Sequence, residues 1–363
     1  MKESNWADYM NKKKKVLVAM SGGIDSSVAA ALLKQKGFEV VGVYMKFLPD
    51  QSRMIEHQSA RKSKEAADCI GIEHFTVDLR EKFSTCIIDY LVKEYSVGLT
   101  PNPCVKCNAR MKFEALLEEK QKIGADLIAT GHYARIHKNP KTNEVCLKRG
   151  VDPLKDQSYF LYLLSQRHLS QAVMPLGDMT KQKVGQEAQN QNLPLTDQKE
   201  SQEICFVPDN DYIRFIKKRT ARGFKKGPIK DQKGNVLGTH QGYARFTVGQ
   251  RRGLGIAASH PLYVLDIDPI NNAVYVGPEQ ELYKDTLIAS RVNWVSATSV
   301  IDSLKVKAQI RYNHTAQDAV VILRSEEWIC VKFDRAQRAV TPGQSVVFYK
   351  GDVLLGGATI MRK

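Results

Sequence analysis

Between residues 15 and 132, short apolar runs alternate with longer segments of helical periodicity, and few folds accommodate such a pattern. The apolar runs are KVLVAM, FEVVGVYM, EHFTVDL and ADLIATGH, and the segments between them have the spacing of helices. Strands that alternate with helices predict a parallel sheet whose crossovers are right-handed. Because the runs are almost continuously apolar, we expect both faces of this sheet to be buried.

The pattern changes after about residue 217. Residues 227 to 256 are rich in turn-forming residues, and Pro269 to Asn272 mark a hairpin. The alternation that follows predicts a small β-barrel or a sandwich. We therefore expect an α/β, Rossmann-like parallel-sheet domain, then a small central β-rich domain and a C-terminal β-barrel. The expected boundaries are 1–217, 218–280 and 281–363.

The positive charge of the chain is concentrated in one segment. The net charge is +15 and the pI is about 9.4, which favours a polyanionic partner. Between residues 214 and 252 a single acid, Asp231, faces twelve cations: Arg214, Lys217, Lys218, Arg219, Arg222, Lys225, Lys226, Lys230, Lys233, Arg245, Arg251 and Arg252. Four aromatic residues lie among them, as on surfaces that bind RNA. The alternative is an ordinary solvated face.

The cysteines indicate a reducing compartment. There are seven, at positions 69, 86, 104, 107, 146, 205 and 330, and an odd, dispersed set does not suit a disulfide framework. No apolar run approaches the ~18 residues that span a bilayer. The apolar run after the initial lysines is only about five residues long and lacks a cleavage site, so we expect a cytoplasmic protein with no membrane partner.

The segment AMSGGIDSS, residues 19–27, follows the first apolar run and opens a helix. Ser21, Gly22 and Gly23 let backbone amides converge on an anion, and the helix N-terminus adds its positive end. Asp25 is suited to hold Mg²⁺ against phosphates. The loop lacks the lysine of a Walker A sequence, which excludes kinases and GTPases of that type. The pattern predicts a phosphate site, against the alternative of a simply capped helix.

A second segment, LTPNPCVKCNARMKF, places Cys104 and Cys107 three residues apart, before a helical pattern. The local sequence leaves three interpretations open: a metal clip, a redox pair, or one nucleophile with an accidental neighbour.

The loop resembles the SGGxDS sequence of the ATP-pyrophosphatase (PP-loop) enzymes, which cleave ATP between the α and β phosphates. Further segments occur in the order TPNPCVKCNARMKF, GADLIATGHYARI, DQSYFLYLLSQ, MPLGDMTKQKV, ESQEICF, FTVGQRRGLGI and PLYVLDID. Together they resemble the tRNA-specific 2-thiouridylases over nearly the whole chain. The three-domain division is also that of this family.

The resemblance implies a reaction. ATP adenylates O2 of the wobble uridine, position 34, of tRNA and releases pyrophosphate. Sulfur carried as a persulfide on an enzyme cysteine then attacks C2, and AMP leaves. The implied cofactors and partners are ATP, Mg²⁺, tRNA, and a sulfur-donor relay protein or cysteine desulfurase. We expect the free protein to be a monomer.

The resemblance also assigns residues. Cys107 and Cys205 would be catalytic, with the persulfide on Cys205 and a later disulfide between the two. The ATP site would contain Ala19, Met20, Ser21, Gly22, Gly23, Ile24, Asp25, Ser26, Met45 and Gly131. The tRNA contacts would be Asn102, Pro103, Cys104, His132, Lys155, Asp156, Gln157, Arg311, Tyr312 and Gln344. A thiolate needs a positive setting, and we expect Cys107 to find one just before a helix.

Cys104 departs from the family, whose members carry aspartate at this position. A thiol, with its reference pKa of ~8.5, cannot inherit the acid–base role of a carboxylate. Cys104, Cys107 and Cys205 are also an alternative ligand set for a [4Fe–4S] cluster that would deliver sulfide, and zinc is a third option. Two other functions remain open: a PP-loop ligase acting on a small molecule, and a non-catalytic RNA-binding redox protein.

Overall fold

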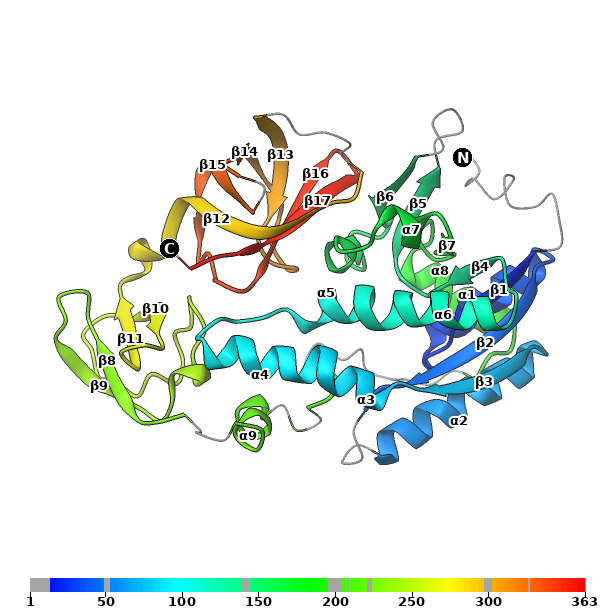
Figure 1. Cartoon of the computed structure of the whole chain (residues 1–363), viewed down its shortest axis with the longest axis horizontal. Coiled ribbons are helices and arrows are strands. Elements are labelled where there is room, and N and C mark those ends of the chain that lie inside the picture. The colour runs from blue at the N-terminus through cyan, green and yellow to red at the C-terminus, as the bar shows by residue number, and fades with distance from the viewer. Residues whose placement is uncertain are drawn as a thin grey trace.

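The structure is a computed structural model that describes residues 14–48, 53–138, 144–194, 204–207, 209, 211–220, 224–296, 302–325 and 327–362. Figure 1 shows a parallel sheet at one end of the molecule and the central domain at the other. Two long helical stretches run between these ends, and the barrel lies beside them. Within the described residues, no helix is long and apolar enough to span a membrane.

The first sheet confirms the predicted parallel α/β architecture. Its strands are β1 (Lys15–Ala19), β2 (Glu39–Lys46), β3 (Glu73–Asp78), β4 (Leu127–Ala129) and β7 (Ala172–Val173), in the order β3-β2-β1-β4-β7. Every neighbouring pair is parallel. Strand β1 therefore lies between β2 and β4, where the strand order reverses, and such a switch point is where open α/β sheets bind ligands.

Helices cover both faces of this sheet, as the apolar runs predicted. On one face Val16 and Val18 pack with residues of α1 (Ile24–Gln35) and α2 (Arg53–Ile70). On the other face Leu17 packs with residues of α6 (Glu114–Lys122). The alternation of side chains along β1 thus divides its residues between two cores.

Two helical stretches lie side by side below the barrel (Figure 1). The first runs from α3 (Arg80–Phe83) through a π-helical turn, Ser84–Ile88, into α4 (Asp89–Ser96). The second runs from α5 (Pro103–Cys107) through a π-helical turn, Asn108–Phe113, into α6. Single π-helical turns within α-helices occur frequently at functional sites.

A hairpin of the first domain joins the barrel. Strands β5 (Ala134–Lys138) and β6 (Val145–Arg149) are antiparallel, and β6 also pairs with the last strand of the chain, β17 (Val353–Ile360). No local sequence pattern predicts this pairing. Three shorter helices follow the hairpin: a 3₁₀ turn, Ser158–Leu161, then α7 (Gln166–Leu169) and α8 (Lys181–Asn190).

The sheet of the central domain follows α9 (Tyr212–Lys217). Its strands are β8 (Gly227–Lys230), β9 (Val236–His240), β10 (Tyr263–Asp268) and β11 (Ala273–Gly277), in the order β10-β11-β8-β9. The antiparallel pairing of β10 with β11 confirms the hairpin predicted at Pro269–Asn272. A 3₁₀ turn, Tyr243–Arg245, lies between β9 and β10.

The C-terminal strands form a closed barrel rather than a sandwich. After a 3₁₀ turn, Glu279–Leu282, they are β12 (Tyr283–Trp294), β13 (Ser303–Gln309), β14 (Gln317–Leu323), β15 (Trp328–Arg338), β16 (Ser345–Lys350) and β17. The order is β12-β15-β14-β13-β16-β17, and β12 pairs with β17 to close the ring. Because the first strand, β12, pairs with the last strand, β17, neither strand is a free sheet edge over the residues that pair. The domain boundaries at 217 and 280 stay predictions.

Candidate active site

The glycine-rich loop after β1 is closed against the start of α1 by its own serines. The Ser21 amide donates to Ser26 Oγ (3.1 Å), and the hydroxyls of Ser26 and Ser27 donate to the Gly23 carbonyl (3.0 and 3.1 Å). Gly22 has φ +82°, and a Cβ there would lie 2.4 Å from the Ser59 carbonyl oxygen. Glycine is therefore required for both conformation and space. The loop has the tight form that an anion site at a helix start needs.

Asp25 is held by two side chains that the sequence analysis did not single out. Lys181 Nζ lies 2.7 and 2.8 Å from the two carboxylate oxygens of Asp25, and the Tyr133 hydroxyl donates to Asp25 Oδ1 at 2.7 Å. Lys181 is the first residue of α8, whose N-cap is Thr180. The available signal was Thr180, a residue type that favours the N-cap position, directly before Lys181 in the quoted segment MPLGDMTKQKV.

The other residues assigned to ATP meet at the same edge of the sheet. A Cβ on Gly131 would lie 3.0 Å from Asp25 C and Ser26 N, so the loop after β4 packs against the loop after β1. Ala19 pairs with Val43 in β2, and Met45 lies two residues further towards the same edge. The carboxyl ends of β1, β2 and β4 therefore bring these residues together, whereas their contact with ATP stays a prediction.

His132 is buried rather than presented on the surface. It is 9% exposed, its ring stacks on Phe113 with centroids 6.0 Å apart, and Nδ1 shares a hydrogen bond with Thr130 Oγ1 (2.8 Å). Burial, and secondarily the Lys112 ammonium, lower the pKa of His132 to about 3. The ring is therefore neutral at physiological pH. Its predicted contact with tRNA is not tested by this arrangement.

The position of Cys107 differs from the expectation. The helix begins at Pro103, with Asn102 as the N-cap, and it continues through Cys107 into the π-helical turn. Cys104 therefore lies in the first turn, and Cys107 lies one turn further in. The prediction that Cys107 stands just before a helix was wrong because Pro103, whose ring favours the first helical position, starts the helix earlier.

The three thiols and Lys112 form one electrostatic group. Burial raises the pKa of the Cys107 thiol to about 12 and that of Cys205 to about 11, and it raises the pKa of Cys104 as well. Cys104 and Cys205 each raise the pKa of Cys107, and Lys112 lowers the pKa of all three thiols. Cys104 and Cys205 are exposed, so water moderates their shifts. The thiols are protonated at neutral pH in this state, and all three are free.

An apolar cluster brings Cys205 to the helix of Cys107. Cys107, Ile204 and Phe206 belong to one core with Phe83 and Met111. The two apolar neighbours of Cys205 thus anchor it from both sides and leave the cysteine exposed. Residues 200–203 of the ESQEICF segment lie outside the described residues.

The described residues contain no group of three or more His, Cys, Asp or Glu side chains placed to hold a metal ion. Cys104, Cys107 and Cys205 do not form such a group. The iron–sulfur route stays an untested alternative.

Asp156, assigned to tRNA, is committed to the protein interior. It is 7% exposed, and its carboxylate accepts hydrogen bonds from Arg149, from the backbone of Gly150, and from the backbone and hydroxyl of Ser158, at 2.7 to 3.1 Å. Gln157 Oε1 accepts from the Tyr133 amide (3.0 Å). Lys155 is half-buried. Contact of these residues with tRNA stays a prediction.

The residues assigned to tRNA in the barrel also bond to the rest of the protein. Gln344 Nε2 donates to the carbonyls of Thr100 (2.8 Å) and Pro101 (3.3 Å), just before Asn102. The Tyr312 ring packs on Phe160 with centroids 4.5 Å apart. The Arg311 guanidinium is partly buried, and this burial lowers its pKa. Their tRNA contacts are not tested.

Part of the basic segment lines a groove of about 380 Å³ beside α9. The groove is lined by Asp211, Ile213, Arg214, Lys217, Lys218 and Arg245. Arg214 is paired with Asp209, but Lys217, Lys218 and Arg245 still outnumber the one acid of the lining, so this surface attracts phosphate. Arg222, which the sequence analysis placed in the same basic segment, lies outside the described residues.

Comparison with known proteins identifies the family. Residues 14–209 match the model of the "tRNA methyl transferase HUP domain", residues 213–278 a "tRNA methyl transferase PRC-barrel domain", and residues 284–360 an "Aminomethyltransferase beta-barrel domain". The chain is 45% identical to "tRNA-specific 2-thiouridylase MnmA 1" of Caldanaerobacter subterraneus subsp. tengcongensis, over 98% of this chain and 100% of the relative. The chain belongs to the tRNA-specific 2-thiouridylase family.

Two further 2-thiouridylases match over almost their entire length. The protein "tRNA-specific 2-thiouridylase MnmA" of Carboxydothermus hydrogenoformans is 46% identical, over 97% of this chain and 98% of its own. The protein of the same name from Halothermothrix orenii is also 46% identical, over 95% of this chain and 98% of its own. The resemblance inferred from the quoted segments is thereby confirmed, together with the fold class.

Proposed function

We propose that this chain is an ATP-dependent tRNA-uridine 2-sulfurtransferase that converts the wobble uridine, position 34, of tRNA to 2-thiouridine. The observation that supports this most directly is the contact between His132 and the helical stretch that carries the cysteines. The His132 ring stacks on Phe113 with centroids 6.0 Å apart, and Phe113 ends the π-helical turn that follows Cys107. His132 also follows Gly131, which packs against Asp25 and Ser26 of the nucleotide loop. A site that activates an oxygen and a site that delivers sulfur therefore adjoin, as a two-step substitution requires.

In the first step, O2 of the uridine attacks the α-phosphorus of ATP. A new phosphorus–oxygen bond forms, the bond to the β-phosphate oxygen breaks, and pyrophosphate leaves with its electron pair. The amides of Gly22 and Gly23 and of the start of α1 would bind the phosphates. Lys181, fixed by Asp25, places an ammonium beside this helix start, where a cation balances developing negative charge.

Mg²⁺ is implied by the family, and Asp25 is the ligand that the sequence suggested. Its carboxylate is already paired with the Lys181 ammonium and accepts the Tyr133 hydroxyl. The Lys181 ammonium, 2.7 and 2.8 Å from the two carboxylate oxygens, would repel Mg²⁺ bound to the same carboxylate. Asp25 therefore does not fit as a magnesium ligand in this arrangement. No step proposed here depends on the metal.

In the second step, the terminal sulfur of a Cys205 persulfide attacks C2, and AMP leaves with the former O2. The nucleobase is then joined to Cys205 through a disulfide. The Cys107 thiol then attacks the Cys205 sulfur and passes its proton to the departing sulfur, which releases the 2-thiouridine and leaves a Cys107–Cys205 disulfide. A thiol reductant restores the two thiols, and a sulfur-donor relay protein or a cysteine desulfurase reloads Cys205, which is exposed. The compartment would be the cytoplasm, and the free enzyme a monomer.

The test combines the purified chain with a tRNA transcript, ATP, and cysteine desulfurase with cysteine as sulfur source. We expect 2-thiouridine in the digested tRNA by mass spectrometry and AMP in equal amount. AMP formed without tRNA, in the presence of ammonia and a carboxylic acid, would favour the ligase. Tight tRNA binding with no AMP under any sulfur donor would favour the RNA-binding redox protein.

The sulfur route needs a separate measurement on protein purified without oxygen. Neither iron nor acid-labile sulfide is expected if Cys205 carries a persulfide. About four of each per chain would instead make the three thiols cluster ligands.

A further inference from the structure

The linker Val97–Pro101 joins the end of α4 to Asn102, the N-cap of the helix that carries Cys104 and Cys107. It starts with a tight turn, in which the Gly98 and Leu99 amides donate to the carbonyls of Tyr95 and Glu94. Gly98 has φ +69°, which glycine adopts without strain. Any displacement of this linker moves the first turn of the cysteine helix, because only Asn102 separates them.

The central domain binds this linker from one side. The Tyr243 hydroxyl donates to the carbonyl of Ser96, the last residue of α4, at 2.6 Å. A Cβ on Gly98 would lie 3.3 Å from both Ile267 Cγ2 and Pro269 Cδ, so the loop after β10 packs directly on the turn.

The barrel binds the same linker from its own side. The Arg362 guanidinium donates to the Gly98 carbonyl at 2.6 Å, and the Thr100 amide donates to the Pro342 carbonyl at 3.0 Å. The backbone of Gly343 approaches so closely that a Cβ there would lie 2.9 Å from both Thr100 N and Thr100 O. The linker is therefore held by both downstream domains within a few residues of each other.

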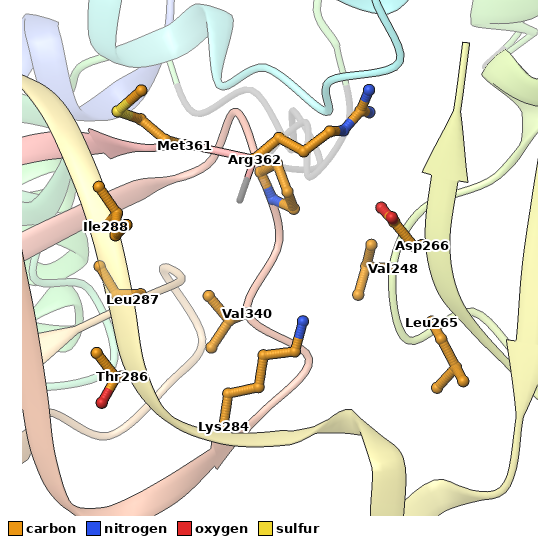
Figure 2. Close-up of a pocket in the computed structure, with 11 residues that line it drawn as sticks. Val248, Leu265, Asp266, Lys284, Thr286, Leu287, Ile288, Val340, Met361 and Arg362 are labelled. Carbon is orange, nitrogen blue, oxygen red and sulfur yellow. The ribbon is translucent and has the colours of Figure 1, made fainter. Parts of the chain in front are cut away.

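The two downstream domains leave an incompletely filled space beside this linker. A cavity of about 100 Å³ separates Val248, Leu265 and Asp266 of the central domain from Lys284 and Leu287 of β12 (Figure 2). Arg362 lies at the border of this cavity. Atoms that line a void lack partners on one side, so a shift of one domain against the other costs little packing here.

We propose that Tyr243 and Arg362 are positioning residues for sulfur transfer. Each ties one downstream domain to the linker, and the two ties together set the place of the helix that carries Cys104 and Cys107. Seating both domains on the substrate then aligns the thiols with the activated base, although neither residue touches the reacting atoms. This inference rests on the proposed function only for the identity of the step that is aligned.

The experiment uses the full chain with Tyr243→Phe, Arg362→Ala, the double variant, and Arg362→Lys as the conservative replacement. Lys284→Ala is the matched control, because Lys284 lines the same cavity without a bond to the linker. Three quantities are measured: the single-turnover rate of 2-thiouridine formation, the Kd for tRNA, and the rate at which iodoacetamide alkylates Cys104 and Cys107, resolved by peptide mass spectrometry.

Each single variant is expected to slow thiolation about fivefold to tenfold, the effect of one lost hydrogen bond, while the Kd for tRNA changes less than about twofold. Alkylation of the two thiols in the free protein should be faster than in the control. The double variant should lose less than the product of the two single effects, because both act through one linker. Arg362→Lys should recover most of the rate.

Two failures are distinguishable. A wild-type protein that makes no 2-thiouridine would refute the proposed function, and the alkylation rates would still test the positioning. Variants that thiolate and alkylate like Lys284→Ala, or that only weaken tRNA binding, would overturn the positioning role while leaving the proposed function intact. Thermal unfolding of each variant shows whether it remains folded.

Discussion

The nucleotide loop and the thiol site are assembled in different ways. Residues 19–27 are consecutive, and their own serines close the loop against α1. The thiol site takes Cys104 and Cys107 from a helix and Cys205 from a much later segment, and an apolar core joins the two. A contiguous loop keeps its form wherever the strand and helix form, whereas the thiol site exists only when distant parts of the fold are in place.

The strongest test of this comparison replaces each thiol in turn. We expect Cys205→Ser and Cys107→Ser to reduce 2-thiouridine formation by at least about a thousandfold, because each removes a reacting sulfur. AMP formation in the presence of tRNA should persist. Cys104→Ser serves as the matched variant and should retain activity within about threefold. If Cys104→Ser is as inactive as Cys205→Ser, Cys104 takes part in the chemistry.

The second test concerns the ion pair at the nucleotide loop. Asp25→Ala and Lys181→Ala should each slow AMP formation about a hundredfold, because Lys181→Ala removes the ammonium beside the phosphates and Asp25→Ala removes the carboxylate that fixes it. Binding of tRNA, measured by filter retention, should not change. Lys183→Ala, on an exposed position of the same helix, is the control. A normal rate for Lys181→Ala together with an inactive Asp25→Ala would mean that Asp25 acts through another partner, such as a metal ion.

The third test concerns the Lys112 ammonium, which lowers the pKa of all three thiols. Because burial raises the pKa of Cys107 to about 12, its alkylation rate should rise about tenfold per pH unit between pH 7 and 9. Lys112→Ala removes the cation that lowers this pKa and should slow alkylation at each pH in that range. Arg110→Ala, an exposed cation on the same helical stretch, should leave the rate unchanged. Faster alkylation in Lys112→Ala would contradict the assignment.

The raised pKa of Cys107 also makes the free energy of unfolding depend on pH. The unfolded thiol ionises at lower pH than the folded one, so its contribution is complete below about pH 8.5. It is lost as the pH rises towards the folded pKa of about 12. Cys107→Ala should therefore reduce the decline of the free energy of unfolding between pH 8 and 10, as measured in urea.

The smallest expected effect concerns the basic groove. Replacing Lys217 and Lys218 by alanine should weaken tRNA binding and reduce the slope of log K against log salt by about 0.7 to 0.9 for each lost phosphate contact. Lys122→Ala, a surface lysine paired with Glu119 on α6, is the control. An unchanged slope would mean that these lysines do not contact phosphate and that the groove is an ordinary solvated face.

What could be predicted from sequence followed from short-range pattern. The order of strands and helices in the first domain and the hairpin at Pro269–Asn272 are encoded by residues close together in the chain. The family resemblance named Cys107 and Cys205, but no local pattern indicated Lys112 as their common cation. The Asp25–Lys181 pair was missed because the partners lie on helices far apart in sequence, where periodicity carries no information about contact.

The error at Cys107 has a different origin. The sequence pattern predicts a helix that follows Cys107, whereas the helix itself starts at Pro103, whose ring fits the backbone geometry of the first helical position. The burial of His132 and Asp156 could not be predicted from their motifs either, because a motif identifies a residue but not the neighbours that surround it in the fold.

The pairing of β6 with β17 affects how this chain can be divided. An isolated barrel, expressed as residues 281–363, would lack the hairpin whose strand β6 pairs with Val353 and Leu354. Those two residues would then present unpaired backbone groups at a sheet edge, which is a template for pairing with another copy. A fragment cut at the apparent boundary is therefore expected to aggregate, and a soluble one would need the hairpin 134–149 supplied as a separate peptide or fused to its end.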